Sequence, residues 1–160
     1  MCNVIVVEDD LDCQQTLAEI LGSEGHDVHS FSTIEDAMTG LQDIKLDVAI
    51  LDFRTPKGDC CSIVGALASK SVSVLVYTAH LSDELHVALL KCGAMWVLAK
   101  PTPLKAIAEY VKKACRVANS IRMAKRMGGV SKELRENLRK STEALAGVTG
   151  RIPLEPAASA

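Results

Sequence analysis

Four short apolar segments of this chain each end in a polar cluster, and this repeated order constrains the fold more than any other feature. Each segment has the length and composition of a buried β-strand. The residues that follow parallel strands emerge at one edge of the sheet, where open α/β sheets bind their ligands. The segments and their clusters are 4–7 before Glu8, Asp9 and Asp10; 48–51 before Asp52; 72–77 before Thr78; and 95–99 before Lys100 and Pro101.

Amphipathic helical patterns separate these segments, and a weaker strand with alternating polarity is predicted over 27–31. The segments at 4–7 and 48–51 are continuously apolar, which is typical of strands that helices cover on both faces. Crossovers between parallel strands are right-handed, so helices are expected on both sides of the sheet. We therefore predict an α/β fold with a doubly wound five-stranded parallel sheet, strand order 2-1-3-4-5, and a C-terminal helical extension.

Capping residues mark the expected helix boundaries. Thr33, with Asp36 three residues on, predicts a helix N-terminus. Ser82 predicts the start of another helix, and Gly93 predicts the C-terminal end of that same helix. The last helix of the sheet domain is predicted to begin near Leu104.

The side chains expected at the sheet edge suit phosphoryl transfer assisted by Mg²⁺. Glu8, Asp9 and Asp52 would repel one another without a cation, and carboxylate oxygens are ligands that Mg²⁺ prefers. Asp52 can act as a nucleophile, because aspartyl phosphate is an established covalent form. Thr78 can donate to a phosphoryl oxygen, and Lys100 can neutralise its charge. Each residue alone is commonly a helix cap, a turn or a solvated charge, but their order along the chain favours one shared site.

With these motifs, residues 2 to about 118 resemble the receiver domains of the two-component response-regulator family. The resemblance implies a flavodoxin-like fold and a phosphorylated signalling switch, which is not an enzyme with a diffusible product. The motifs that carry it are Glu8-Asp9-Asp10, Asp52 with Pro56 four residues on, Tyr77-Thr78-Ala79, and Gly93-Ala94 leading to Lys100-Pro101.

The resemblance also implies a role for each site residue. Asp52 matches the phosphoacceptor, which receives a phosphoryl group from a histidine kinase in a Mg²⁺-dependent reaction. Thr78 matches the switch hydroxyl. Lys100 matches the lysine that pairs with the phosphoryl group, and its bond to Pro101 is cis in the family.

The Mg²⁺ ligands implied by the resemblance are two acids of the first cluster, the phosphoacceptor and one backbone carbonyl. Asp9 matches the direct ligand, and Glu8 matches the acid that holds the ion through water. Asp52 is both acceptor and ligand, and the carbonyl belongs to Arg54.

One aromatic residue departs from the pattern of the family. The family places an aromatic residue at the position of Val97, whereas this chain has Trp96 one place earlier. A shift of one residue on a strand moves a side chain to the other face of the sheet. We therefore expect the Trp96 ring to point away from Thr78.

The net charge of −2 conceals an uneven distribution. Residues 1–103 carry 6 Lys or Arg against 15 Asp or Glu, and residues 104–160 carry 12 against 5. We expect a receiver domain over 1–118, a helical extension over 119–150 and a disordered tail over 151–160. Three roles are open for the extension: it packs back on the domain, associates with a second copy into a homodimer, or contacts nucleic acid. Its weak turn chemistry disfavours the last of these.

Composition also indicates where the protein is located and whether its cysteines are oxidised. No run of about eighteen apolar residues is present, and the N-terminus does not resemble a signal peptide, so we expect a cytoplasmic protein without membrane contact. In a reducing cytosol the cysteines are expected to be free thiols that pack as small hydrophobic residues. The six are Cys2, Cys13, Cys60, Cys61, Cys92 and Cys115.

The expected partners are a sensor histidine kinase or phosphotransfer protein and a downstream protein target. In this interpretation the chain signals through protein contacts. A second interpretation makes it the receiver and linker of a DNA-binding transcriptional regulator. A third, a Mg²⁺-dependent phosphatase on the same fold, is weaker, because the chain offers no second acid–base group beyond His80.

Overall fold

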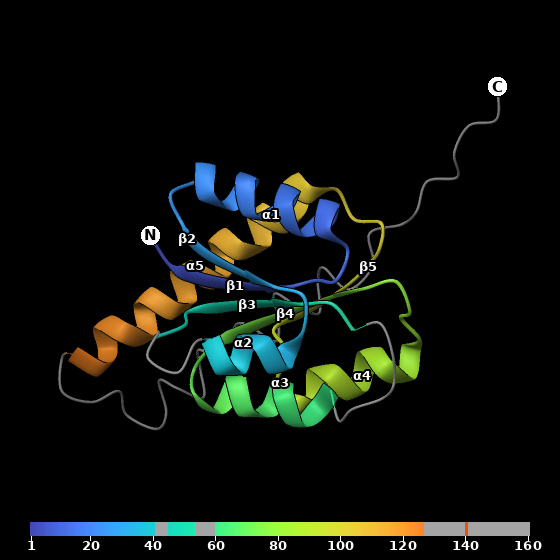
Figure 1. Cartoon of the computed structure of the whole chain (residues 1–160). Coiled ribbons are helices and arrows are strands. Elements are labelled where there is room, and N and C mark those ends of the chain that lie inside the picture. The colour runs from blue at the N-terminus through green and yellow to red at the C-terminus, as the bar shows by residue number, and fades with distance from the viewer. Residues whose placement is uncertain (41–44, 54–59, 127–139, 141–160) are drawn as a thin grey trace. The chain divides into compact units, whose positions relative to one another are not determined.

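A five-stranded parallel sheet of order β2-β1-β3-β4-β5 lies at the centre of the fold (Figure 1). The computed structural model describes residues 1–40, 45–53, 60–126 and 140; Arg54, most of the predicted extension over 119–150 and the tail at 151–160 lie outside them. The predicted strand order is confirmed. The strands are β1 (Asn3–Val7), β2 (Asp27–Phe31), β3 (Val48–Leu51), β4 (Ser73–Thr78) and β5 (Trp96–Ala99).

Helices cover both faces of this sheet, as the right-handed crossovers require. Helices α1 and α5 lie on one face, and α2, α3 and α4 lie on the other (Figure 1). The weakly apolar β2 is half-exposed at the edge of the sheet, whereas every residue of β3 and β4 is buried. The helices are α1 (Leu11–Ser23), α2 (Ile34–Gly40), α3 (Cys60–Ser69), α4 (Asp83–Cys92) and α5 (Leu104–Arg126).

Neighbouring residues of β5 point to opposite faces of the sheet. Val97 pairs with Val76 of β4 and lies in a buried cluster with Leu89 of α4. The Trp96 ring instead packs against Tyr110 of α5, with ring centroids 5.4 Å apart. The expectation that the aromatic ring points away from the Thr78 side is therefore confirmed.

The predicted helix caps are present. The Thr33 hydroxyl donates to the Asp36 carboxylate at 2.7 Å and accepts from the Asp36 backbone N–H at 3.1 Å. Ser82 caps α4 by accepting from the backbone N–H of Leu85 at 3.1 Å. Gly93 ends that helix in the left-handed conformation, with φ +109°.

Helix α5 runs unbroken from Leu104 to Arg126, past residue 118, and ion pairs fasten it to the rest of the domain. Lys112 lies 2.8 Å from the Glu24 carboxylate at the end of α1. Near the end of α5, Arg122 pairs with the buried Asp47. Within the described part of the chain, no helix has the length and apolarity needed to span a membrane.

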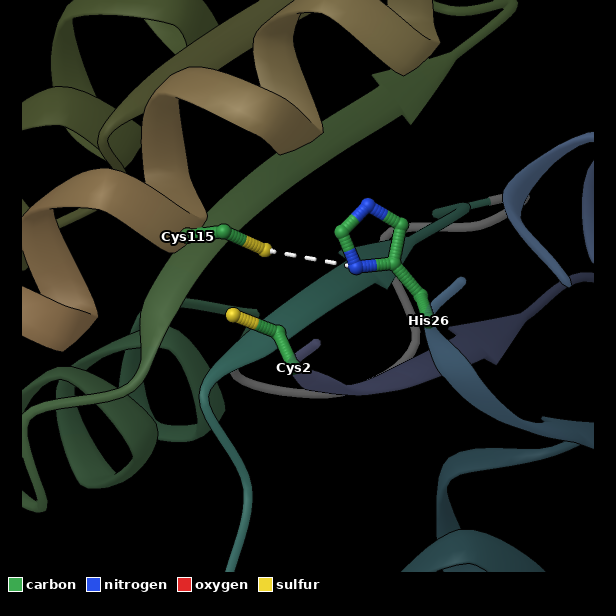
Figure 2. Close-up of side chains that lie close together, drawn as sticks. All are labelled: Cys2, His26 and Cys115. Atoms are coloured by element: carbon green, nitrogen blue, oxygen red, sulfur yellow. Dashed lines mark hydrogen bonds between the residues drawn. The ribbon is translucent and has the colours of Figure 1, made fainter. Parts of the chain in front are cut away.

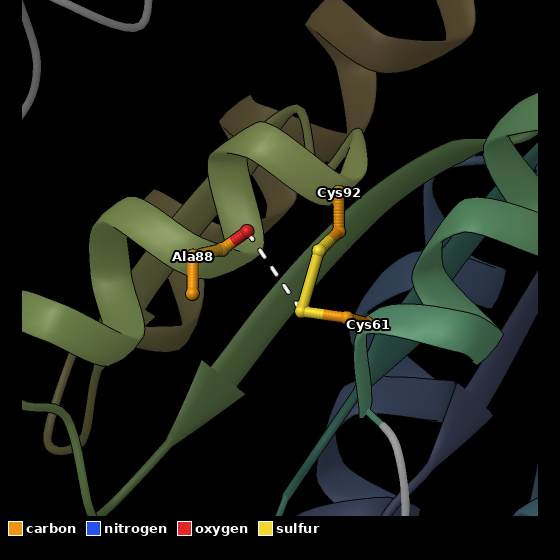
Figure 3. The surroundings of a disulfide bond; sticks show 3 residues. All are labelled: Cys61, Ala88 and Cys92. Atoms are coloured by element: carbon orange, nitrogen blue, oxygen red, sulfur yellow. Dashed lines mark hydrogen bonds between the residues drawn. A yellow bond between two sulfur atoms is a disulfide. The ribbon is translucent and has the colours of Figure 1, made fainter.

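The expectation of free thiols is wrong for two cysteines. Cys61 of α3 and Cys92 of α4 form a disulfide, with Cα atoms 5.2 Å apart, beside the Ala88 carbonyl (Figure 3). The two residues are 31 positions apart, so local spacing gave no sign of the pair. Packing of α3 against α4 brings them within the distance that a disulfide requires. Cys2, Cys13 and Cys115 are free, as expected.

Replacing Gly93 with Ala is expected to lower the free energy of unfolding by at least about 1–2 kcal/mol, because a Cβ atom opposes the left-handed conformation. The added Cβ would also lie 2.9 Å from the Ala68 side chain. Urea unfolding followed by circular dichroism measures the loss. The matched control is Gly22→Ala in α1, whose Cβ meets nothing within 4 Å and which should be neutral or stabilising. Equal effects of the two substitutions would contradict the conformational explanation.

Candidate functional site

The ends of β1 and β3 place two acidic side chains next to each other. Val7 pairs with Leu51 in the parallel register, so the residues that follow, Glu8 and Asp52, are neighbours where the strand order reverses. The Asp52 backbone N–H continues the ladder by donating to the Val7 carbonyl at 2.8 Å. Both side chains are almost completely buried, with exposed fractions of 2% for Glu8 and 6% for Asp52.

Lys100 comes from β5, two strands away from β3, and bridges these two carboxylates. Its Nζ lies 2.6 Å from Glu8 Oε2 and 2.7 Å from Asp52 Oδ2. Its backbone N–H donates to the Thr78 carbonyl at 2.8 Å, and the bond from Lys100 to Pro101 is cis, as the resemblance implies. The ammonium group therefore neutralises one of the two buried negative charges.

Burial and charge act in opposite directions on these groups. Burial raises the pKa of Glu8; the hydrogen bond from Lys100 opposes this shift, and the Asp52 charge adds to it. Burial alone would lower the pKa of Lys100, but its hydrogen bonds to Asp52 and Glu8 outweigh burial and raise it. The lysine therefore stays charged at neutral pH, as its position between two carboxylates requires.

Three carboxylates at this edge can hold a divalent cation. Oxygen atoms of Glu8, Asp9 and Asp52 all lie within 4.8 Å of one another. Asp52 Oδ2 is occupied by Lys100, whereas Asp52 Oδ1 is buried without a hydrogen bond to any described residue. A buried carboxylate oxygen of this kind needs a ligand, and a hard cation such as Mg²⁺ is suitable. The donor set therefore fits the metal that the sequence predicts.

Thr78 reaches the same edge, and its hydroxyl hydrogen-bonds to the backbone on either side of the site. The side chain is fully buried, and Thr78 Oγ1 donates to the Phe53 carbonyl at 2.7 Å and accepts from the His80 backbone N–H at 3.3 Å. The hydroxyl thus ties β4 to the residue directly after Asp52.

Several residues near the site carried no recognisable signal in the sequence. Gln14 of α1 donates from its side chain to the Glu8 carbonyl at 2.7 Å and so supports the acidic loop. Burial, with the neighbouring Glu8 charge, raises the pKa of the Cys13 thiol to about 11.

Asp10, the third acid of the first cluster, caps α1 by accepting from two backbone N–H groups. Asp10 therefore stabilises the start of α1, whereas Glu8 and Asp9 belong to the acidic cluster.

Replacing Lys100 with Met is expected to destabilise the metal-free protein, because Glu8 and Asp52 then repel each other. Removing one member of a buried ion pair typically costs about 3–5 kcal/mol. Losing Lys100 also raises the pKa of Glu8 further, since the lysine was lowering it. A raised pKa in the folded state favours folding at low pH, and this advantage is lost as pH rises through it. The loss of unfolding free energy caused by Lys100→Met should therefore become smaller as the pH is lowered from neutral to about pH 5.

Urea unfolding in the presence of a chelator, at neutral and at acidic pH, measures this deficit. Lys105→Met at an exposed position of α5 is the control and should change little. A deficit that is equal at the two pH values would show that carboxylate repulsion is not its cause.

Solved structures of several receiver domains share this fold. The signal receiver domain of a putative Luxo repressor protein from Vibrio parahaemolyticus has a TM-score of 0.70 at 24% identity, covering 81% of this chain and 98% of that one. A response regulator from Thermotoga maritima has a TM-score of 0.66 at 22% identity, covering 72% and 98%. At these identities the likeness concerns the fold alone.

Similar sequences occur in longer proteins. A positive alginate biosynthesis regulatory protein of Pseudomonas aeruginosa is 32% identical over 127 residues, which are 76% of this chain and 50% of that protein. A protein-glutamate methylesterase/protein-glutamine glutaminase of Myxococcus xanthus is 30% identical over 161 residues, 98% of this chain and 40% of that protein. The chain thus spans half or less of the length of these two relatives.

The sequence model of the response regulator receiver domain matches residues 4–112, which include the strand-end acids and all five strands except Asn3 of β1. This match covers more than half of the chain, and the sheet order agrees with it. The chain belongs to the response-regulator receiver-domain family of two-component signalling systems.

Proposed function

We propose that Asp52 accepts a phosphoryl group from the phosphohistidine of a histidine kinase or phosphotransfer protein. The observation that carries this proposal is the unequal environment of its two oxygens. Lys100 holds Oδ2, while Oδ1 makes no hydrogen bond to a described residue, so Oδ1 is available to bind the metal or to form a bond to phosphorus. An O–P bond forms at Asp52 as the P–N bond of the phosphohistidine breaks, and the imidazole leaves.

The same proposal includes a Mg²⁺ ion held by Glu8, Asp9, Asp52 and the backbone carbonyl of Arg54. When bound, this ion neutralises charge on the phosphoryl oxygens. Oxygen atoms of Glu8, Asp9 and Asp52 that lie within 4.8 Å of one another are the hard ligands that a divalent ion prefers, which supports this ion. Arg54 lies outside the described residues, so its part rests on the resemblance alone.

Lys100 and Thr78 are the groups that respond to the new phosphoryl charge. Lys100 Nζ is already 2.7 Å from Asp52 and needs only a small movement to pair with a phosphoryl oxygen. Thr78 must release the Phe53 carbonyl before its hydroxyl can donate to that oxygen. Because Val97 carries no ring, the change passes to α4 through the backbone of β4 and β5.

The first candidate for how the chain passes on its signal is direct contact with a downstream protein. In this proposal the chain is a switch and not an enzyme that acts on a diffusible substrate. The second candidate is the receiver-and-linker portion of a DNA-binding transcriptional regulator. It is supported by relatives named as regulators, of which this chain covers 50% and 26%. Homodimer formation through the basic extension is compatible with both candidates.

Incubation with acetyl phosphate and Mg²⁺ is expected to add one acid-labile phosphoryl group, and Asp52→Asn is expected to abolish it. The amide oxygen of Asn is a poor nucleophile and carries no charge for a metal. Intact-mass spectrometry measures the addition. Asp12→Asn, which changes an exposed acid of α1, should be labelled like the wild-type protein. Full labelling of Asp52→Asn, with normal thermal unfolding, would place the acceptor elsewhere.

Addition of Mg²⁺ is expected to raise the melting temperature, because an ion that binds only the folded state stabilises it. Asp9→Ala should remove most of the increase, since Asp9 is the proposed direct ligand. Glu8→Ala should remove less of it. Differential scanning calorimetry at constant ionic strength, with KCl in place of MgCl₂ as control, makes the comparison. An undiminished Mg²⁺ response in Asp9→Ala would refute this set of ligands.

A further inference from the structure

Two thiols and an imidazole converge at the end of the sheet opposite to the acidic site. Cys2 directly precedes β1, His26 directly precedes β2, and Cys115 lies on α5 (Figure 2). One ligand atom of each residue lies within 4.8 Å of the other two. The Cys115 sulfur is 3.8 Å from His26 Nδ1. The proposed phosphoryl transfer uses none of these three groups.

The backbone holds the three side chains in place. In the β1–β2 register Asn3 pairs with Asp27, so Cys2 and His26 are brought together by the first pair of the ladder. The Asp27 backbone N–H donates to the Cys2 carbonyl at 2.9 Å. Cys115 lies on the buried face of α5, and both thiols are buried, with exposed fractions of 1% for Cys2 and 6% for Cys115.

We propose that Cys2, His26 and Cys115 form a binding site for Zn²⁺. Two thiolates and one imidazole are a ligand set that zinc prefers, and the hard Mg²⁺ ion does not compete for sulfur. Tetrahedral coordination with the usual Zn–S and Zn–N bond lengths places sulfur and nitrogen ligands roughly 3.5–3.8 Å apart. The distance of 3.8 Å between the Cys115 sulfur and His26 Nδ1 agrees with this spacing, and the other two distances are at most 4.8 Å. Three protein ligands leave the fourth position to water.

The ionisation of the cluster is compatible with zinc binding. Burial lowers the pKa of His26, which keeps the imidazole neutral and able to offer a nitrogen lone pair. Burial, together with the neighbouring Cys2, raises the pKa of the Cys115 thiol, so the metal-free Cys115 thiol is protonated at neutral pH. Zinc therefore displaces two thiol protons to solvent as the two Zn–S bonds form. A bound ion would join α5 to the starts of β1 and β2.

Cobalt(II) binds at zinc sites and absorbs visible light, so it can be used to test the proposal. The experiment uses the full chain, kept reduced with a phosphine. One equivalent is expected to give a thiolate-to-cobalt charge-transfer band, and one equivalent of Zn²⁺ is expected to remove that band. Metal analysis after gel filtration should find one zinc per chain, and zinc should raise the melting temperature. Cobalt bound at Glu8, Asp9 and Asp52 gives no thiolate band, so the two ends of the sheet are distinguished.

Cys2→Ser and Cys115→Ser should each lose the charge-transfer band, and His26→Gln should shift and weaken it while leaving both thiols in place. Cys13→Ser, which removes a free cysteine outside the cluster, is the matched control and should bind cobalt like the wild-type protein. Circular dichroism without metal verifies that each variant is folded. No thiolate band in the wild-type protein, or an unchanged band in Cys115→Ser, would overturn the site.

Discussion

The ammonium group of Lys100 is the charge on which the strand-end site of this protein depends. The parallel register of β1 and β3 forces Glu8 and Asp52 to be neighbours, and both are buried. Two desolvated carboxylates in contact would repel each other strongly. Lys100 reaches them from β5 with hydrogen bonds of 2.6 and 2.7 Å, so the far strand of the sheet stabilises its centre.

This arrangement also makes the site sensitive to added charge. A cation near Glu8, Asp9 and Asp52, or a phosphoryl group on Asp52, would compete for the hydrogen bonds that Lys100 makes now. Thr78 adds a second connection, because its hydroxyl bonds to the carbonyl of Phe53, the residue directly after Asp52. A change at Asp52 can therefore reach β4 through a single hydrogen bond.

The two ends of the sheet differ in their chemistry. Carboxylate oxygens gather at the carboxyl ends of the strands, whereas sulfur and imidazole nitrogen gather at the amino ends of β1 and β2. Helix α5 contributes Cys115 to the second group and is held nearby by the pairing of Arg122 with Asp47. The hard and the soft ligand groups are therefore separated by the length of the strands.

The sequence by itself determined the strands and the helix caps through short-range rules, and it determined the sheet order and the acidic cluster through the general rules for parallel strands and their crossovers. Alternation and apolar runs define strands, Thr33 and Ser82 cap helices with their own side chains, and parallel strands bring their carboxyl ends to one edge. Only the tertiary structure decided the Cys61–Cys92 disulfide, the convergence of Cys2, His26 and Cys115, and the bond from Thr78 to Phe53. His26 and Cys115, for example, are 89 positions apart. Such contacts depend on how a helix packs against another helix or the sheet, and no local pattern of residue types encodes that packing.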